Sequence, residues 1–416
     1  MLSKLFKKLT ELGPAFFIIG YVIGTGSVTS MVISGAKYGL NFWWPLLLSC
    51  FFTYFLLIAI SKLTIVTGET LMFSFKRHFG KFFTLFIVSA LVVSIVSSVI
   101  GVMGVVADVF QEWLYQISAG AIEINKTLIA LVFIILLLIL FWTGKHQNFI
   151  SWMTIMVSLM ALCFVITSFM VLTEPGVNVK EFFPDKILGE NSGLIVAGMV
   201  GTTMAGVCLV SRSILVQEQG WQVADIPAEN KDARYSMILT FIISLAIMIA
   251  SAGTLYLQGI EIDNPIDMMS ALEPLAGEFA LTVFAMGILA AGLSSIFPNL
   301  LLFPWLLSDY NNTPRDMKRS LYKAIVILVG LSTLIVPFFG GRPIWILIAS
   351  QALSPFIMPL LTLFLIILLN KKDVMKEHTV GWPMNIALGA TLLFNCYMLF
   401  VAIEGFINFA MTDGAV

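Results

Sequence analysis

Charged residues are scarce in this 416-residue chain: Asp, Glu, Lys and Arg together make up 11% of it, and there are only three histidines. So small a share lies far below that of soluble domains and leaves no basic patch for nucleic acid. The four cysteines, Cys50, Cys163, Cys208 and Cys396, all lie in apolar segments, so the sequence predicts neither a disulfide framework nor a cysteine metal motif. No nucleophile–base pair or phosphate-binding loop indicates an enzyme, and no cofactor is implied.

Apolar residues, by contrast, are abundant. They account for 59% of the chain and occur in blocks long enough to cross a bilayer. In hydrocarbon each backbone amide must be satisfied within its own segment, so such blocks have to be helices. We therefore predict an all-α integral membrane protein, a single transmembrane domain over residues 1–416 with eleven helices. The predicted helices cover residues 12–35, 40–66, 82–114, 125–144, 148–173, 193–217, 235–259, 279–308, 320–340, 343–370 and 382–410.

The distribution of lysine and arginine predicts the orientation. If the N-terminus is cytoplasmic, 18 of the 23 Lys and Arg residues fall on the inner side, and five fall on the outer side: Lys37, Lys126, Lys180, Lys186 and Arg342. Because positive residues accumulate on the cytoplasmic side, we expect the N-terminus inside and the C-terminus outside. The predicted location is a bacterial inner (plasma) membrane, with the lipid bilayer as the only large partner.

Two predicted helices are interrupted by small residues in corresponding places. The first contains Ile23-Gly24-Thr25-Gly26-Ser27, and the sixth contains Gly201-Thr202-Thr203-Met204-Ala205-Gly206. Paired interruptions of this kind are typical of inverted-repeat transporters, whose broken helices expose backbone groups to a substrate near the bilayer midplane. We therefore predict a secondary transporter with two inverted five-helix repeats (about 12–173 and 193–370), broken helices 1 and 6, and an additional helix at about 382–410.

Five short motifs follow one another along nearly the whole chain: Gly35-Ala36-Lys37-Tyr38-Gly39, Ile65-Val66-Thr67-Gly68, Gly201-Thr202-Thr203, Gly287-Ile288-Leu289-Ala290-Ala291-Gly292 and Ser350-Gln351. In this order they resemble the Nramp (natural resistance-associated macrophage protein) family of proton-coupled divalent-metal transporters, in the amino acid-polyamine-organocation superfamily. The resemblance implies the fold of that family.

The metal ligands of that family are absent. Where the family has Asp-Pro-Gly-Asn, this chain has Gly24-Thr25-Gly26-Ser27, and where it has Met-Pro-His, this chain has Ala205-Gly206-Val207. Of the positions matching the family's metal contacts, Gln351 is retained. A divalent ion that leaves water at mid-membrane depth needs anionic or several strong oxygen ligands. This reasoning predicts that the chain binds no metal and carries a small neutral polar organic solute by alternating access.

We favour a monosaccharide such as glucose as that solute, because a neutral, hydroxyl-lined pocket offers many donors and acceptors. An amino acid is the alternative, since glycine-rich helix starts bind carboxylates. A divalent metal ion, manganese or magnesium, and a non-transporting sensor are less favoured. The predicted substrate-binding residues are Gly24, Thr25, Gly26, Ser27, Ser98, Thr203, Ala205, Gly206, Val207, Asn299 and Gln351.

Two further roles are predicted from single positions. Arg212 follows the interruption of the sixth helix by less than two turns, and a charge at that depth indicates a gating role. Ser294 and Ser295 resemble the hydroxyl pair of sodium-coupled members of the superfamily. Sodium coupling at these two serines is therefore one expectation.

Overall fold

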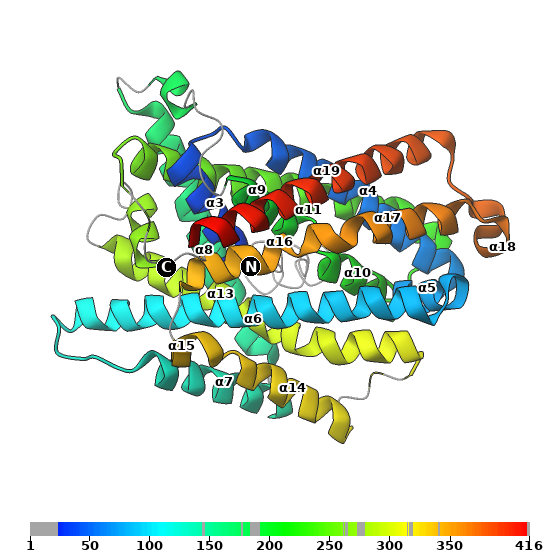
Figure 1. The fold of residues 1–416 in the computed structure, drawn as a ribbon, viewed down its shortest axis with the longest axis horizontal. Helices are drawn as coiled ribbons and strands as arrows, with labels where there is room; N and C mark the ends of the chain where they lie inside the picture. Colours follow the sequence, from blue (N-terminus) through cyan, green and yellow to red (C-terminus); the bar gives the residue numbers. More distant parts are fainter. Residues whose placement is uncertain are drawn as a thin grey trace, which may run out of the picture.

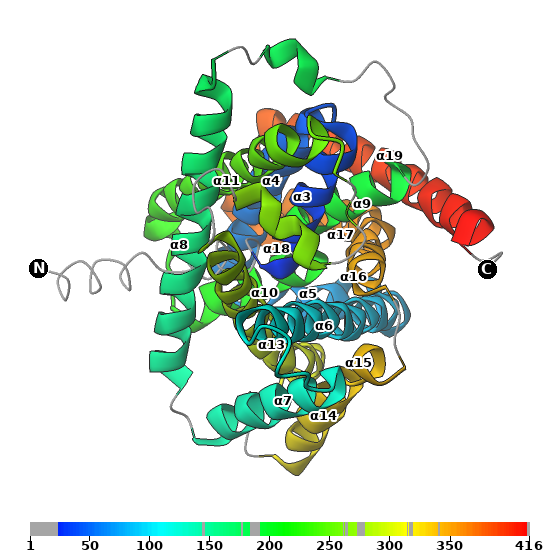
Figure 2. The ribbon, with the colours of Figure 1, turned by 90° about the vertical axis from the view of Figure 1, so that its left-hand side faces the viewer.

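The computed structural model describes residues 24–143, 146–175, 178–183, 192–260, 262, 265–272, 279–313, 315, 319–339 and 342–413. Within these residues the chain is helical, and no β-strand is assigned. Most of the longer helices run close to parallel with one another and form a single bundle (Figure 1), whereas α8 (His146–Thr173) lies across them (Figure 2).

The helices follow the apolar blocks of the sequence. In chain order the main ones are α3 (Thr25–Tyr38), α4 (Trp43–Thr67), α5 (Leu71–Phe79), α6 (Lys81–Ile117), α7 (Lys126–Thr143), α8 (His146–Thr173), α9 (Ser192–Thr203), α10 (Gly206–Glu218), α11 (Ile226–Ser251), α13 (Ala280–Asn311), α14 (Ser320–Ser332), α15 (Ile335–Phe339), α16 (Pro343–Ala352), α17 (Ser354–Asn370), α18 (Lys372–Met375) and α19 (Trp382–Asp413). Each predicted span that lies within the described residues corresponds to one of these helices or to two in succession.

Nine helices in the described part of the chain are long and apolar enough to cross a membrane, two fewer than the eleven predicted. The predicted first span begins before residue 24, outside the described residues. The fifth is represented only by the apolar stretch Val157–Thr173 of α8, which is shorter than the length counted as a membrane span. The prediction of an all-helical membrane protein is confirmed, and the count of eleven stays a prediction.

The helices differ in how deeply they are buried. In the apolar stretch that α9 and α10 form together, 89% of residues are buried, against 22% in α7 and 33% in α19. Figure 2, which looks along the bundle, accordingly shows α3, α9 and α10 near the middle and α7, α8, α14 and α19 at the periphery. The peripheral helices carry large exposed apolar side chains, as lipid-facing helices do.

Two of the central segments are discontinuous. The sixth predicted helix stops at Thr203 and restarts at Gly206, which confirms its predicted interruption. The tenth is also broken, at Leu353 between α16 and α17, although we expected it to be continuous. The signal for this second break is Ser354-Pro355, because proline is favoured in the first turn of a helix and lacks the amide that a continuous helix would need. Of the first helix, the structure describes only the part that starts at Thr25.

Candidate functional site

The interruption of the sixth helix opens onto a pocket at the centre of the bundle. Gly24 precedes α3 and Ala205 precedes α10, and neither helix start has a side-chain cap. The backbone amides of an uncapped first turn lack partners within the helix. Two helix starts and the last turn of α9 therefore contribute polar backbone to this region.

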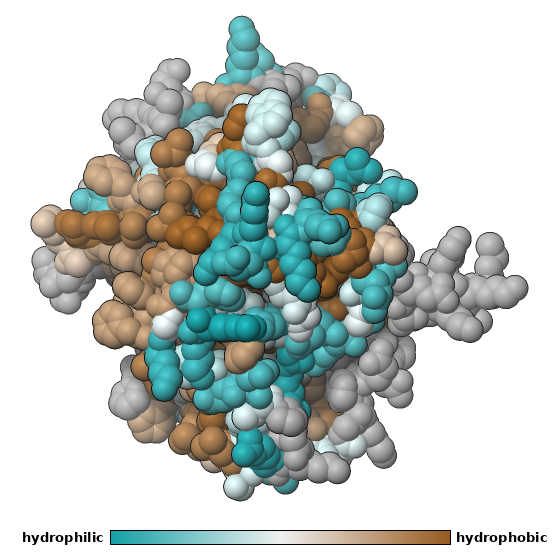
Figure 3. All heavy atoms as spheres, turned by 90° about the vertical axis from the view of Figure 1, so that its right-hand side faces the viewer, coloured by the Kyte–Doolittle hydropathy of each residue, from teal (hydrophilic) through white to brown (hydrophobic). Residues whose placement is uncertain are grey.

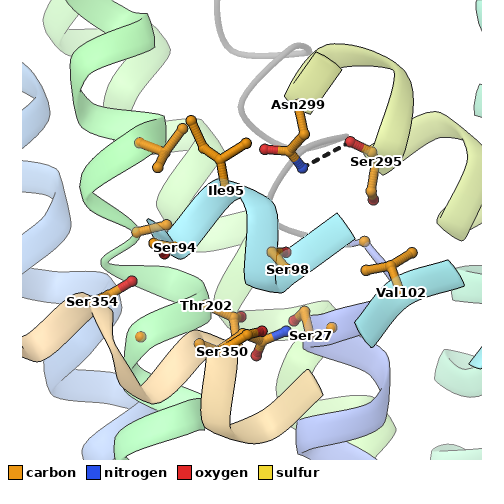
Figure 4. A pocket seen from close by; sticks show the side chains of 16 residues that line it. Ser27, Ser94, Ile95, Ser98, Val102, Thr202, Ser295, Asn299, Ser350 and Ser354 are labelled. Carbon is orange, nitrogen blue, oxygen red and sulfur yellow. Dashed lines mark hydrogen bonds between the residues drawn. The ribbon is translucent and has the colours of Figure 1, made fainter. Parts of the chain in front are cut away.

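The pocket offers about 50 Å³ to the centres of water-sized molecules and is lined mainly by small polar residues from several helices. Figure 4 shows Ser94 and Ser98 of α6, Ser295 and Asn299 of α13, and Ser350 of α16 gathered around the same space. The amide nitrogen of Asn299 donates to the backbone oxygen of Ser295 over 2.9 Å. The full lining is Gly24, Gly26, Ser27, Ser94, Ile95, Ser98, Val102, Gly201, Thr202, Ala205, Val207, Ser295, Asn299, Ser350, Gln351 and Ser354.

Gln351 is packed tightly between α3 and α9. The hydroxyl of Ser30 donates to its Oε1 over 3.1 Å. A Cβ atom added at Gly26 would lie 1.6 Å from its Nε2, and one added at Gly201 would lie 2.1 Å from its backbone oxygen. Real Cβ atoms do not approach other atoms so closely, so Gly201 is required where the backbone of α16 passes, and Gly26 makes room for the Gln351 side chain. The position and orientation of Gln351 therefore depend on two glycines that are far apart in the sequence.

The structure brings together eight of the eleven predicted binding residues. The other three have different surroundings: the Thr25 hydroxyl donates to the backbone oxygen of Ile288, the Thr203 hydroxyl donates to that of Met199, and Gly206 packs near Leu91. The eight that line the pocket are Gly24, Gly26, Ser27, Ser98, Ala205, Val207, Asn299 and Gln351.

Thr202 and Ser350 line the pocket but were not predicted to do so. Thr202 is the neighbour of Thr203, which was predicted but does not line the pocket, and Ser350 is the neighbour of Gln351, which lines it as predicted. The hydroxyls of Ser294 and Ser295 both donate to the backbone oxygen of Ala291. Such bonds within a helix are common for serine and do not support the predicted sodium coupling.

The pocket is electrically neutral. Among the residues that the structure describes, its lining contains no carboxylate, imidazole, thiol or thioether. In the part of the chain that the structure describes, no group of three or more His, Cys, Asp and Glu residues is placed to hold a metal ion. A cation in this pocket would have only neutral oxygens around it, from hydroxyls, side-chain amides and backbone.

Arg212, the predicted gating residue, lies on α10 in a buried charged network that the sequence had not predicted. Its side chain is fully buried and donates to Glu229 over 2.7 Å and to Asp232 over 2.9 Å, both on α11. A third bond, of 3.2 Å, reaches the hydroxyl of Ser61 on α4. One positive charge thus faces two negative charges, and the network joins α10 to α4 and α11.

Comparison with known proteins identifies the family. The model of the family described as natural resistance-associated macrophage protein-like matches residues 15–403. The chain belongs to the Nramp family. The resemblance inferred from short motifs is therefore confirmed, and with it the prediction of a transporter-type, multi-pass membrane protein.

Relatives match this Nramp chain over almost its entire length. A protein of Caldanaerobacter subterraneus named "Divalent metal cation transporter MntH" is 24% identical, and the match covers 96% of this chain and 94% of that protein. A protein of the same name from Listeria welshimeri is 26% identical, with 96% and 92% covered. These relatives are bacterial, in agreement with the predicted bacterial membrane location.

Solved structures agree with the fold. The manganese transporter of Eremococcus coleocola, in complex with an aromatic bis-isothiourea substituted compound, superimposes with a TM-score of 0.72 at 15% identity, covering 95% of this chain and 87% of that one. Mhp1, a nucleobase-cation-symport-1 family transporter, gives a TM-score of 0.60 at 15% identity, covering 96% and 93%.

The prediction that a Nramp-like chain without metal ligands carries a sugar, or alternatively an amino acid, is wrong. It is overturned by the family match and by full-length relatives that are named divalent metal cation transporters. The error arose because the absence of anionic side chains was taken as the absence of a cation site. Neutral oxygens and retained water can also surround a hard cation.

Proposed function

We propose that this protein transports a divalent metal cation and that the ion binds in the pocket between α9, α10 and their neighbours. The observation that carries the proposal is the family match over residues 15–403, together with full-length relatives named for this activity. The pocket supports it, because polar residues converge where the sixth helix is broken.

The chemistry of the pocket favours a hard cation. Oxygen ligands suit Mg²⁺ and Mn²⁺, whereas softer transition metals prefer sulfur or imidazole, which this lining does not offer. Mg²⁺ gives up its water reluctantly and is commonly bound with several waters retained. About 50 Å³ of space for the centres of water-sized molecules leaves room for an ion with a few of its waters. We therefore propose Mg²⁺ or Mn²⁺, contacted by Ser27, Asn299 and Gln351 both directly and through water.

The helix ends supply part of the missing negative charge. The C-terminus of α9 lies at the pocket, and the carbonyl end of a helix carries a partial negative charge of about half an electron. Its last residues, Gly201 and Thr202, belong to the lining. The N-termini of α3 and α10 have the opposite polarity, so we place the ion closer to α9.

We further propose the two inverted repeats, the inside location of the N-terminus and alternating access as the transport mechanism. The broken sixth helix and the fold similarity to Mhp1, a transporter, support this architecture. The excess of lysine and arginine on one side supports the orientation.

The test is uptake of Mn²⁺ and Mg²⁺ into proteoliposomes containing the purified protein. We expect both ions to enter, and Asn299→Ala or Gln351→Ala to raise the KM by roughly tenfold, the equivalent of about 1.4 kcal/mol of lost binding. The matched control is Gly389→Ala on α19, where an added Cβ meets no atom within 4 Å, and it should leave uptake unchanged. If neither ion enters faster than it enters empty vesicles, the proposal is wrong.

A further inference from the structure

A second set of polar contacts lies at the end of the bundle that carries α5 and α18. Figure 3 views this end and shows hydrophilic side chains gathered across it, with hydrophobic surface beside them. Here the last turn of α13 and the residues after it meet the end of α10 and the turn between α4 and α5. A cleft with about 430 Å³ of space for the centres of water-sized molecules lies between them, lined by Thr70, Gln217, Glu218, Ser308, Asp309, Asn312, Thr313 and Arg315.

Asp309 connects α13 to the start of α5. It is only 3% exposed, and the Thr70 hydroxyl donates to its Oδ1. The backbone amides of Met72 and Phe73, in the first turn of α5, also face this carboxylate. Thr70 does not cap α5 with its own side chain, and the carboxylate of Asp309 lies beside this helix start. A negative charge at a helix N-terminus is stabilising.

Arg315 connects the residues after α13 to the end of α10. Its guanidinium donates to Glu218 over 2.8 Å and to Gln217 over 2.9 Å. The amide nitrogen of Gln217 in turn donates over 2.8 Å to the backbone oxygen of Gly68, which ends α4. One arginine therefore links three segments that are far apart in the sequence.

A third contact strengthens the same junction. The ammonium group of Lys76 on α5 donates to the backbone oxygen of Tyr310 over 2.7 Å, and it lies 4.0 Å from the centre of the Tyr310 ring. Asp309, Tyr310 and Arg315 thus hold α5 and α10 against one helix, α13.

Two of the helices joined here, α10 and α13, are walls of the central pocket. The N-terminal end of α10 contributes Val207 to the lining, and α13 contributes Ser295 and Asn299. A path from the pocket to this end requires α10 and α13 to separate, and the junction fixes their far ends together. Its bonds are reversible: Arg315 and Glu218 are 18% and 46% exposed, so water can replace their ion pair at little cost.

We propose that Asp309 and Arg315 are gating residues of the transport cycle, which close the pocket toward this end by holding α5 and α10 against α13. They are positioning residues, because neither lines the ion pocket. The proposal rests on the proposed transport function, and on the proposed orientation this gate is the cytoplasmic one.

The experiment measures access to the pocket from each side. In a variant with all four native cysteines replaced, Ser98→Cys places a reporter thiol in the pocket, and a membrane-impermeant methanethiosulfonate is applied to oriented vesicles. We expect Arg315→Ala to raise the labelling rate from the α5 side by about fivefold or more, and not from the opposite side. Asp309→Asn, which preserves the shape of the side chain, should have the same direction of effect.

Two further variants distinguish gating from a general loosening. Exchange of the charges, Glu218→Arg with Arg315→Glu, should restore slow labelling. Arg77→Ala breaks the nearby Arg77–Glu69 pair, which joins only α5 to the turn before it, and should leave the rate unchanged. Unchanged labelling in Arg315→Ala and Asp309→Asn, equal increases from both sides, or an increase in Arg77→Ala would each overturn the proposal.

The outcome is separate from that of the cargo test, because thiol labelling needs no metal ion. Increased labelling from one side without any cation uptake would leave the gate in place and reject the proposed cargo. Cation uptake with unchanged labelling would support the proposed cargo and reject the gate.

Discussion

Gln351 is the residue on which the pocket depends most closely. Its side chain occupies space that any residue other than glycine at position 26 would fill, and its backbone oxygen lies against Gly201. The two contacts are not equivalent. At Gly26 the nearest atom is the end of a flexible side chain, whereas at Gly201 it is backbone that cannot move without shifting α16.

Gly26→Ala should therefore impair transport while the protein still folds. The new methyl group displaces the Gln351 amide, so we expect uptake of Mn²⁺ to fall by tenfold or more with little change in the melting temperature in detergent. Uptake assays and thermal unfolding of the same preparation check this. Normal uptake would show that the orientation of Gln351 is unimportant.

Gly201→Ala should instead destabilise the fold. A Cβ atom 2.1 Å from the Gln351 backbone oxygen forces α9 and α16 apart. Overpacking of this kind costs about 1–3 kcal/mol or more. We expect a clear drop in melting temperature and in the yield of monodisperse protein, measured beside Gly389→Ala. Equal stability of the two variants would contradict the close approach.

Ala205 lies in the pocket lining at the position where the family has the methionine of its Met-Pro-His motif. Ala205→Met would place a thioether beside the neutral oxygens, since Ala205 lines the pocket. Sulfur ligands favour soft metals. We expect Cd²⁺ to compete poorly with Mn²⁺ uptake in the unmodified protein and severalfold better in the variant. Ala205→Leu, similar in size but without sulfur, is the control and should not show this gain.

Among the elements, α10 combines a role in the pocket with a buried charge. Arg212 ties it to Glu229 and Asp232 on α11 and to Ser61 on α4, with no exposed surface on the guanidinium. Buried ion pairs contribute modestly to stability as a whole, but removing one partner leaves charge without compensation. The network therefore fixes the position of α10 relative to α4 and α11.

Arg212→Met should destabilise the protein by roughly 3–5 kcal/mol, because two carboxylates then lose their counter-charge. Thermal or denaturant unfolding measures the loss. Adding Glu229→Gln and Asp232→Asn should recover much of it, since neutral side chains remove the unpaired charge. If the triple variant is no more stable than Arg212→Met alone, the loss comes from packing and not from charge.

The elements also show what could be predicted from sequence. The helices could be predicted because the bilayer requires long apolar helical segments, and the interruption at Thr203–Gly206 because small residues cluster there. The break at Leu353 was missed, although Pro355 marked it. The partners of Arg212 were missed because Glu229 and Asp232 lie near the start of the next helix, and only the packing of α10 against α11 brings them inside.

Only part of the pocket could be predicted, because tertiary packing decides which side chains face it. Composition and small-residue clusters identified the segments that line it, but the facing side of each helix depends on tertiary packing. Thr203 was predicted and Thr202 lines the pocket, a difference of one position on the same helix. The predicted substrate, a sugar or an amino acid, was wrong. It rested on the absence of the family's metal ligands, although the family motifs occur in order along the chain.

At the scale of the whole molecule, charge is distributed unevenly between the two ends of the bundle. Hydrophilic side chains cover the end that carries α5 and α18 (Figure 3). With that end in the cytoplasm, lysine and arginine are concentrated on the inner side, as the positive-inside rule requires. The proposed direction of the Asp309–Arg315 gate depends on this assignment.

Cysteine labelling in intact cells tests the orientation directly. In the cysteine-free background, Ala121→Cys lies in the turn after α6 and Lys372→Cys lies on α18, and both positions are exposed at opposite ends of the bundle. A membrane-impermeant maleimide should label the cysteine at position 121 in intact cells and the one at 372 only after the membrane is opened. The reverse pattern would place α5 and α18 outside, and the gate formed by Asp309 and Arg315 would then close the outer side of the pocket.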